Sequence, residues 1–149
     1  MLACRQRGRQ CGRSASFHQD CERRTAGSAV YALSLGSSAD GAVSVTTTGA
    51  IITFGPTSDG VYVYSLGGQV IVTVATVTTF DQFADGIYAK SFGAGADGAV
   101  SATATGTIST GDNHSKGVIA LSYGSGADGA VSVTETGTVS TAGGDSRGV

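Results

Sequence analysis

The chain repeats itself, and a tandem repeat constrains the fold more than any other feature because each unit must pack against a similar neighbour. Four related units follow one another. They span residues 29–59, 60–85, 86–116 and 117–147. The second unit is shorter, and four of its five missing residues fall in one turn, where Gly67-Gly68-Gln69 replaces GSSADGA. Solenoid loops vary in length while strands keep their register, so the sequence predicts a single stacked repeat domain.

Each unit contains three short stretches that predict β-strands, separated by glycine-rich turns. Valine, isoleucine and threonine dominate these stretches, and β-branched side chains favour strands whereas glycine disfavours helix interiors. In the first stretch, alternate positions hold small or branched apolar residues, namely Val30/Ala32, Val61/Val63, Ile87/Ala89 and Val118/Ala120. The opposite face holds Leu33, Tyr64, Lys90 and Leu121. A lysine on that face indicates that it meets solvent and that the alternating positions face the core.

The second and third stretches follow the same alternation. Their inward positions are Val43/Val45, Val70/Val72, Val100/Ala102 and Val131/Val133 in the second stretch, and Ile51, Val77, Ile108 and Val139 in the third. A narrow core with one layer per repeat is what stacked coils with strands about 4.8 Å apart require. The sequence therefore predicts an all-β fold, a parallel β-solenoid (β-helix) of about four coils with three short strands per coil. Equivalent residues such as Val100 and Val131 are expected to pair in parallel on adjacent coils.

Residues 1–27 differ from the repeats and predict a separate, disordered head. They carry six arginines against Asp20 and Glu22, a net charge of +4, and all three cysteines of the chain, without hydrophobic alternation. The cysteine spacings match no zinc module. We therefore expect a boundary after residue 27, between this head and a solenoid domain that spans residues 28–149. That the head is not native coding sequence is an alternative that stays open.

The repeat region is mildly acidic. Residues 28–149 carry Lys90, Lys116 and Arg147 against nine acidic residues, a net charge of −6. Nucleic-acid affinity rests largely on the neutralisation of phosphates by lysine and arginine, so we expect no nucleic-acid partner. No apolar run approaches the roughly 18 residues of a membrane helix, so we expect no membrane insertion of this chain. No motif indicates a cofactor.

The third and fourth units resemble the passenger-domain repeats of autotransporter proteins. Those repeats run as Gly-Ile-Tyr-Ala, a serine with a glycine-rich turn, alternating valine and threonine, Gly-x-Ile-x-Thr, and a Gly-Asp-x-Ser stretch. The third unit reads GIYAKS at residues 86–91, GTIST at 106–110 and GDNHS at 111–115. The resemblance extends over residues 29–149, and it contains no catalytic signature.

This resemblance implies a right-handed parallel β-helix, secreted or displayed on the cell surface of a Gram-negative bacterium by a C-terminal transmembrane β-barrel. The chain begins with no signal peptide and ends on the start of another repeat, Gly148-Val149. We therefore expect a fragment of a longer passenger, whose further repeats and β-barrel translocator lie outside this sequence.

One aspartate recurs at the same position of three units. Asp40, Asp97 and Asp128 each precede a glycine in a turn. Stacked carboxylates can bind Ca²⁺ or serve glycan cleavage, so Asp97 and Asp128 are the candidate metal ligands. Asp-Gly is also an ordinary turn pair, and the calcium nonapeptide needs tandem nine-residue repetition. His114 is the only histidine of the repeats. We therefore expect turns here, with no metal and no catalytic residue.

Aromatic residues form two columns that run across the units. The first consists of Tyr31, Tyr62 and Tyr88 and is interrupted by Ile119, and the second consists of Leu35, Leu66, Phe92 and Tyr123. The five aromatic residues are candidates for a sugar-stacking stripe, because aromatic faces suit the flat apolar patches of glycans. The structural alternative is a ladder that stabilises neighbouring coils.

These features lead to the hypothesis of a stalk or interaction surface without enzymatic activity, which adheres to a host-cell or glycan surface. The alternative is a fragment of a β-helix enzyme that degrades polysaccharides. Long insertions that carry arginine, lysine and acids would favour the enzyme. The uniform 31-residue units with short turns favour the stalk.

Overall fold

The computed structural model describes the backbone of residues 15–18 together with residues 27–35, 41–93 and 98–149. The first repeat contributes β2 (Val30–Ser34), β3 (Val43–Thr46) and β4 (Ala50–Thr53). The second contributes β5 (Val61–Ser65), β6 (Val70–Val74) and β7 (Thr76–Thr79). The third contributes β8 (Ile87–Gly93), β9 (Val100–Ala104) and β10 (Ile108–Thr110). The fourth contributes β11 (Val118–Gly124), β12 (Val131–Glu135) and β13 (Val139–Thr141).

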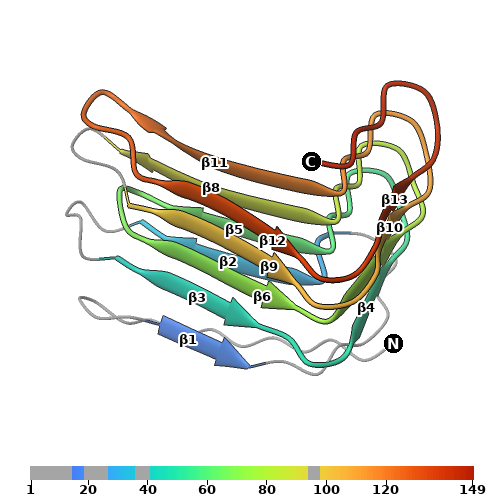
Figure 1. The fold of residues 1–149 in the computed structure, drawn as a ribbon, viewed down its shortest axis with the longest axis horizontal. Helices are drawn as coiled ribbons and strands as arrows, with labels where there is room; N and C mark the ends of the chain where they lie inside the picture. The colour runs from blue at the N-terminus through green and yellow to red at the C-terminus, as the bar shows by residue number, and fades with distance from the viewer. Residues whose placement is uncertain (1–14, 19–26, 36–40, 94–97) are drawn as a thin grey trace.

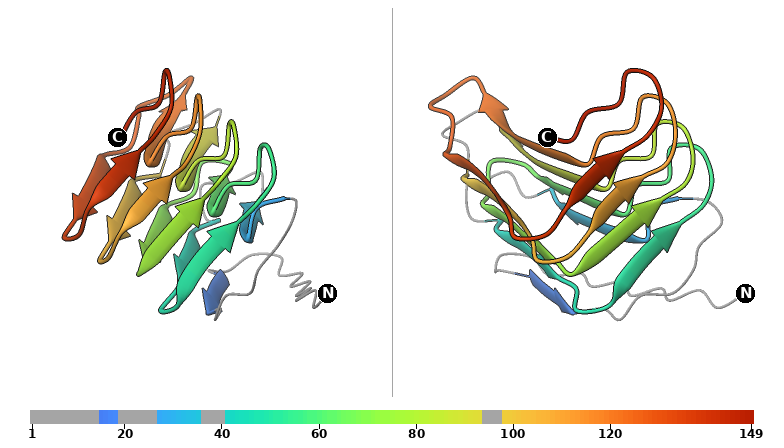
Figure 2. Two further views of the ribbon diagram at one scale, coloured as in Figure 1. Left: turned by 90° about the vertical axis from the view of Figure 1, so that its right-hand side faces the viewer. Right: turned by 45° about the vertical axis from the view of Figure 1, so that its right-hand side comes forward.

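Strands at the same position of successive repeats pair in parallel and form three sheets (Figure 1). We name each sheet by the strand that the first repeat contributes to it. The β2 sheet contains β2, β5, β8 and β11, and the β4 sheet contains β4, β7, β10 and β13. The β3 sheet contains β3, β6, β9 and β12 and, at its edge, β1 (Ala15–His18). Each coil passes through all three sheets before the next coil begins (Figure 2). The chain is therefore a right-handed parallel β-solenoid, which confirms the predicted fold class.

Equivalent residues of the repeats pair in register along each sheet. Val43 pairs with Val70, Val70 with Val100, and Val100 with Val131. This column crosses the short second repeat without a shift, although the turn before β6 is four residues shorter than in the first repeat. The predicted parallel pairing of Val100 and Val131 is confirmed.

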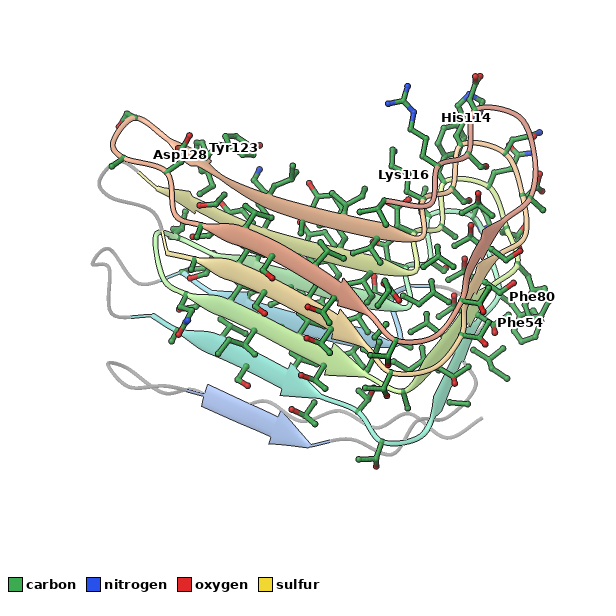
Figure 3. All side chains as sticks on the ribbon, viewed as in Figure 1. Phe54, Phe80, His114, Lys116, Tyr123 and Asp128 are labelled. Atoms are coloured by element: carbon green, nitrogen blue, oxygen red, sulfur yellow. The ribbon has the colours of Figure 1, made fainter. Side chains whose placement is uncertain are left out.

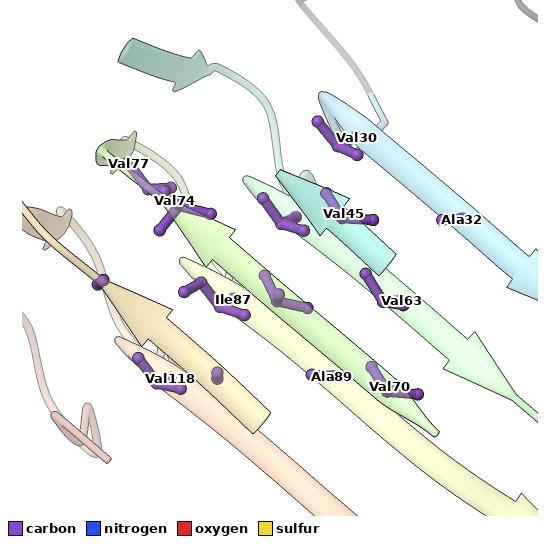
Figure 4. Packing of buried hydrophobic residues seen from close by; sticks show 14 of the residues in the cluster. Val30, Ala32, Val45, Val63, Val70, Val74, Val77, Ile87, Ala89 and Val118 are labelled. Carbon is purple, nitrogen blue, oxygen red and sulfur yellow. The ribbon is translucent and has the colours of Figure 1, made fainter. Parts of the chain in front are cut away.

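The core is a narrow stack of aliphatic side chains between the sheets (Figure 4). The inward residues of the first three coils are buried, among them Val45, Val63 and Ile108. At the equivalent positions of the fourth coil, Val131 is 48 % exposed and Val139 is half-buried. The inward columns predicted from alternation are thus confirmed, and the core becomes accessible to solvent at the C-terminal end of the stack.

Some hydroxyl side chains also point inward, where they hydrogen-bond to the turns. The Thr53 Oγ1 donates to the carbonyl of Ser58 at 2.7 Å, and the Thr79 Oγ1 donates to the carbonyl of Ala84 at 2.7 Å. At the other end of the coil, the Ser91 Oγ donates to the carbonyl of Gly68 in the preceding coil at 2.9 Å. Each bond satisfies a buried polar group of an irregular segment that lacks strand pairing.

The turns that lead from one coil to the next share one backbone feature in every repeat. We call residues 54–60, 80–86, 111–117 and 142–148 the return turns. Each contains one non-glycine residue in the left-handed region, and these residues are Thr57, Phe83, His114 and Asp145, with φ between 55° and 61°. Backbone bonds join the turns along the stack, for example from the Thr57 N–H to the carbonyl of Gln82 at 3.0 Å. This shared frame continues the strand ladders through the turns.

One strand lies within the head that the sequence predicts to be disordered. β1 (Ala15–His18) pairs in parallel with β3, so that Ala15 aligns with Val43 and His18 with Thr46. These four residues differ from the expectation, because strand pairing needs backbone groups and does not require hydrophobic alternation. Residues 1–14 and 19–26 lie outside the described residues, and the boundary at residue 27 stays a prediction.

Candidate binding face

Aromatic side chains gather on one outer face of the solenoid. We call the outward residues of the β2 sheet the aromatic face, which includes Tyr31, Leu33, Tyr62, Tyr64, Tyr88, Lys90, Phe92 and Tyr123. In β3, β6, β9 and β12, the outward positions hold serine and threonine apart from Ile71. Tyr123 lies at the end of β11 near the turn that contains Asp128, whereas Lys116 lies at the opposite end (Figure 3). Exposed rings also occur outside this face, at Phe80 and Phe83 of the return turns. An exposed apolar patch is typical of a contact surface.

The structure brings the three tyrosines of the first predicted column together in one stack. The ring centroids of Tyr31 and Tyr62 are 5.1 Å apart, and those of Tyr62 and Tyr88 are 5.0 Å apart, with interplanar angles of 14° and 4°. Each ring therefore covers a face of its neighbour, and the column presents ring edges and hydroxyl groups outward. This geometry stabilises adjacent coils, and it leaves a free ring face for a sugar only at the ends of the stack.

Phe92 and Tyr123 form a different arrangement around a lysine. Their centroids are 5.1 Å apart at an interplanar angle of 61°. The Lys90 Nζ lies 4.6 Å from the centroid of Tyr123, 5.0 Å from that of Phe92 and 5.4 Å from that of Tyr64. An ammonium group at these distances is attracted by the ring quadrupoles. The hydrogen bond and charge of Tyr123 raise the pKa of Lys90, so this cluster combines exposed rings with a permanent positive charge.

Two carboxylates that sequence reasoning missed lie in the return turns that lead into β5 and β8, the strands of Tyr62 and Tyr88. Asp59 and Asp85 occupy the same position of successive return turns. The Asp59 Oδ1 accepts a hydrogen bond from the Asp85 N–H at 2.9 Å, and the Asp85 Oδ1 accepts one from the Lys116 N–H at 2.7 Å. The negative charge of Asp59 contributes to raising the pKa of Tyr62 and Tyr88, after the larger effect of burial. The two aspartates could have been found in the sequence by the Asp-Gly pair that recurs where the first unit joins the second and the second joins the third.

The environment of these carboxylates opposes ionisation. Burial, together with the charge of Asp85, raises the pKa of Asp59 from 3.8 to about 6, although the hydrogen bond from the Asp85 N–H lowers it in part. Burial also raises the pKa of Asp85, against the lowering effects of its hydrogen bond from Lys116 and of the Lys116 charge. The folded protein therefore binds a proton at Asp59 more tightly than the unfolded chain does.

We predict that acidification stabilises the protein through Asp59. Because the folded pKa is raised, the stability contribution is fully present below about pH 4 and is lost as the pH rises through about 6. Asp59→Asn keeps an oxygen acceptor for the Asp85 N–H without the charge. It is expected to raise the free energy of unfolding at neutral pH by about 1 kcal/mol, a value reduced for the partial exposure of the carboxyl group.

Urea unfolding at several pH values between 4 and 7 tests this prediction. Asp128→Asn is the matched control, because Asp128 is exposed and accepts a hydrogen bond from the Gly124 N–H within its own turn. The control should retain the wild-type slope of stability against pH. A wild-type protein that gains stability between pH 4 and 6 would contradict the assignment.

Of the three aspartates that recur at one position of the repeats, the structure describes only Asp128. Asp128 closes a turn through its 3.2 Å hydrogen bond from the Gly124 N–H, which is the role expected of an Asp-Gly pair. Asp40 and Asp97 lie outside the described residues, so their proximity to Asp128 stays a prediction. The His114 Nε2 lies 3.5 Å from the Asp145 Oδ2, and the His114 ring stacks on Phe83. Among residues 27–35, 41–93 and 98–149, no group of three or more histidine, cysteine or acidic side chains is arranged to hold a metal ion.

The fold defines this chain as a repeat protein of the parallel β-solenoid class. No protein-family model, curated protein or solved structure matches the chain. In the part of the chain that the structure describes, no helix has the length and apolar character needed to span a membrane. The aromatic face and the repeat architecture are therefore the features of this chain that bear on its function.

Proposed function

We propose that this chain is a structural and adhesive segment of a cell-surface protein, a stalk or interaction surface of the kind found in autotransporter passengers. The resemblance of the repeats supports display on the outer surface of a Gram-negative cell. The in-register stack supports a role in reach, because each added coil lengthens the solenoid without a change in its cross-section.

The observation that carries the adhesive part is the concentration of exposed aromatic side chains on one of the outer faces. Phe92 and Tyr123 keep 38 % and 42 % of their surface exposed beside the Lys90 ammonium. Ring faces and edges contact the C–H surfaces of sugars, while a lysine attracts carboxylate groups. The partner that fits this cluster is a glycan surface, and acidic glycans are favoured over neutral ones.

We predict that the double variant Phe92→Ala/Tyr123→Ala loses glycan binding by roughly tenfold or more, because exposed aromatic anchors dominate such interfaces. Binding of the chain to immobilised acidic and neutral glycans measures the effect. Lys90→Gln should reduce the preference for acidic glycans and leave binding to neutral ones nearly unchanged.

The double variant Ser132→Ala/Thr134→Ala is the matched control. Both residues face outward on the coil that contains Tyr123, but they belong to the β3 sheet and not to the aromatic face. It should bind like the wild type. If the control loses binding as much as the aromatic variant, or if the folded aromatic variant binds normally, adhesion does not use the aromatic face.

A polysaccharide-degrading enzyme is the second candidate, and the Asp59 and Asp85 carboxylates favour it because they occupy successive coils and are joined by a hydrogen bond from the Asp85 N–H to the Asp59 Oδ1. Both carboxylates already accept backbone hydrogen bonds from the next coil, which accounts for their position without catalysis. Release of reducing ends from acidic polysaccharides, abolished by Asp85→Asn, would support the enzyme over the stalk.

A further inference from the structure

A second aromatic stack lies at the corner of the return turns, away from the aromatic face. The ring centroids of Phe54 and Phe80 are 4.8 Å apart, and the interplanar angle is 8°. Figure 3 shows both side chains on the side of the solenoid opposite to Tyr123 and Asp128. Phe54 is half-buried, whereas Phe80 is 49 % exposed. The stack is therefore better covered at Phe54 than at Phe80.

The stack stops at Phe80 because the next coil has a glycine at the equivalent position. The register of β7, β10 and β13 places Phe80, Gly111 and Ala142 in one column. The three atoms nearest to a Cβ built at Gly111 would be backbone atoms of Thr79 and Phe80, at 3.2 to 3.6 Å. One coil further on, Ala142 has only a methyl group. The second face of the Phe80 ring therefore points to a layer in which the third coil has no side chain.

Carboxylate groups accompany this layer, because Asp81 and Asp112 directly follow the phenylalanine and the glycine of the column. The Asp81 Oδ2 accepts a hydrogen bond from a backbone N–H of the preceding coil at 2.7 Å. The Asp112 Oδ1 accepts one from the N–H of the next residue at 2.6 Å. Each carboxylate keeps further acceptor sites, and neither forms an ion pair within the described part of the chain. The corner therefore combines an accessible ring face with two uncompensated negative charges.

We propose that this corner binds an arginine side chain from a basic segment of a partner protein. A guanidinium group is planar, so it can enter the layer at Gly111, stack on the Phe80 ring and donate hydrogen bonds to the Asp112 carboxylate. A lysine ammonium has the same charge but cannot stack in this way. A neutral sugar gains nothing from the two negative charges, and an acidic glycan is repelled by them. The site is separate from the aromatic face and binds ligands of the opposite charge.

Titration of the full chain with an acetylated and amidated Gly-Arg-Gly-Arg-Gly peptide, followed by the NMR signals of the phenylalanine rings, tests this proposal. The arginine peptide should shift the Phe80 signals and bind several-fold more tightly than its lysine counterpart. Gly111→Phe fills the layer with a ring of the chain itself, so it is expected to weaken binding by roughly tenfold. Ala142→Phe places a second ring about two coil spacings from Phe80, on the other side of the guanidinium. It should strengthen binding by roughly threefold.

Matched variants separate this site from the net charge of the repeats. Asp112→Asn should weaken binding of the arginine peptide by roughly threefold, whereas Asp128→Asn removes the same charge on the opposite side and should not change it. Gly144→Phe adds a ring to the same corner outside the Phe80 column and should bind like the wild type.

Circular dichroism confirms that each variant is folded. Equal weakening by Asp112→Asn and Asp128→Asn, or a folded Gly111→Phe protein with wild-type affinity, would overturn the proposal. A neutral methyl glucoside that shifts the Phe80 signals when the arginine peptide does not would also overturn it.

Discussion

Replacement of Ile108 by alanine is expected to lower the free energy of unfolding by about 2 to 5 kcal/mol, one of the two largest effects we anticipate. Ile108 is fully buried in the third coil and lies between Val77 and Val139 of the adjacent coils. The substitution removes three carbons from a core to which each coil contributes a single layer of side chains. Strand pairing fixes the spacing of the coils on both sides, so the neighbours cannot collapse into the cavity.

Val139→Ala is the matched control for the cavity term, since Val139 is in the same column one coil later but is only half-buried. Its expected cost is about 1 kcal/mol or less, because water already reaches the site. Urea unfolding followed by circular dichroism measures both variants. Equal losses at the two positions would mean that the last coil is as well covered as the third.

Gly86→Ala is expected to destabilise the protein by about 1 to 3 kcal/mol or more, although it adds only a methyl group. A Cβ atom at residue 86 would lie 2.5 Å from the carbonyl oxygen of Gly117 and 2.6 Å from the Cγ2 of Ile108. The first atom belongs to the backbone of the next coil and the second to the packed core, so neither can move away cheaply. Glycine occupies the last position of all four return turns, as Gly60, Gly86, Gly117 and Gly148.

Gly144→Ala provides the comparison, because an added Cβ at residue 144 would meet only the Asn113 Oδ1, at 3.5 Å. That substitution should change the melting temperature little. A Gly86→Ala protein that melts at the wild-type temperature would show that the coils can separate at this bend, which would contradict the tight stacking of the return turns.

The repeat and its alternation were sufficient to predict the solenoid. In-register stacking places equivalent residues of successive units next to one another. The column of Val43, Val70, Val100 and Val131 could therefore be predicted directly from the sequence. The tyrosine column followed from the same logic, because parallel register places Tyr31, Tyr62 and Tyr88 one above another. Residues that lie one repeat apart in the sequence are neighbours in the stacked coils.

Relations between different columns were not predictable. The burial of the Asp59 carboxyl group depends on how the return turn bends before β5, and the period gives no information about that bend. The position of the Lys90 ammonium among three rings likewise depends on side-chain rotamers. The hydroxyl groups of Thr53 and Thr79 were missed because alternation predicts only that a residue faces inward and does not identify its hydrogen-bond partner.

The left-handed position of the return turns bears on how such a protein can diversify. A threonine, a phenylalanine, a histidine and an aspartate occupy it in successive coils, with nearly the same φ. The N–H groups of Phe83 and His114 donate to the carbonyls of Asn113 and Gly144 in the next coil, so the backbone itself holds the corner. The side chain at this position is exposed in the first, second, third and fourth coils alike. Mutational drift can therefore alter the exposed side chain of each coil at this corner while the hydrogen-bonded scaffold remains unchanged.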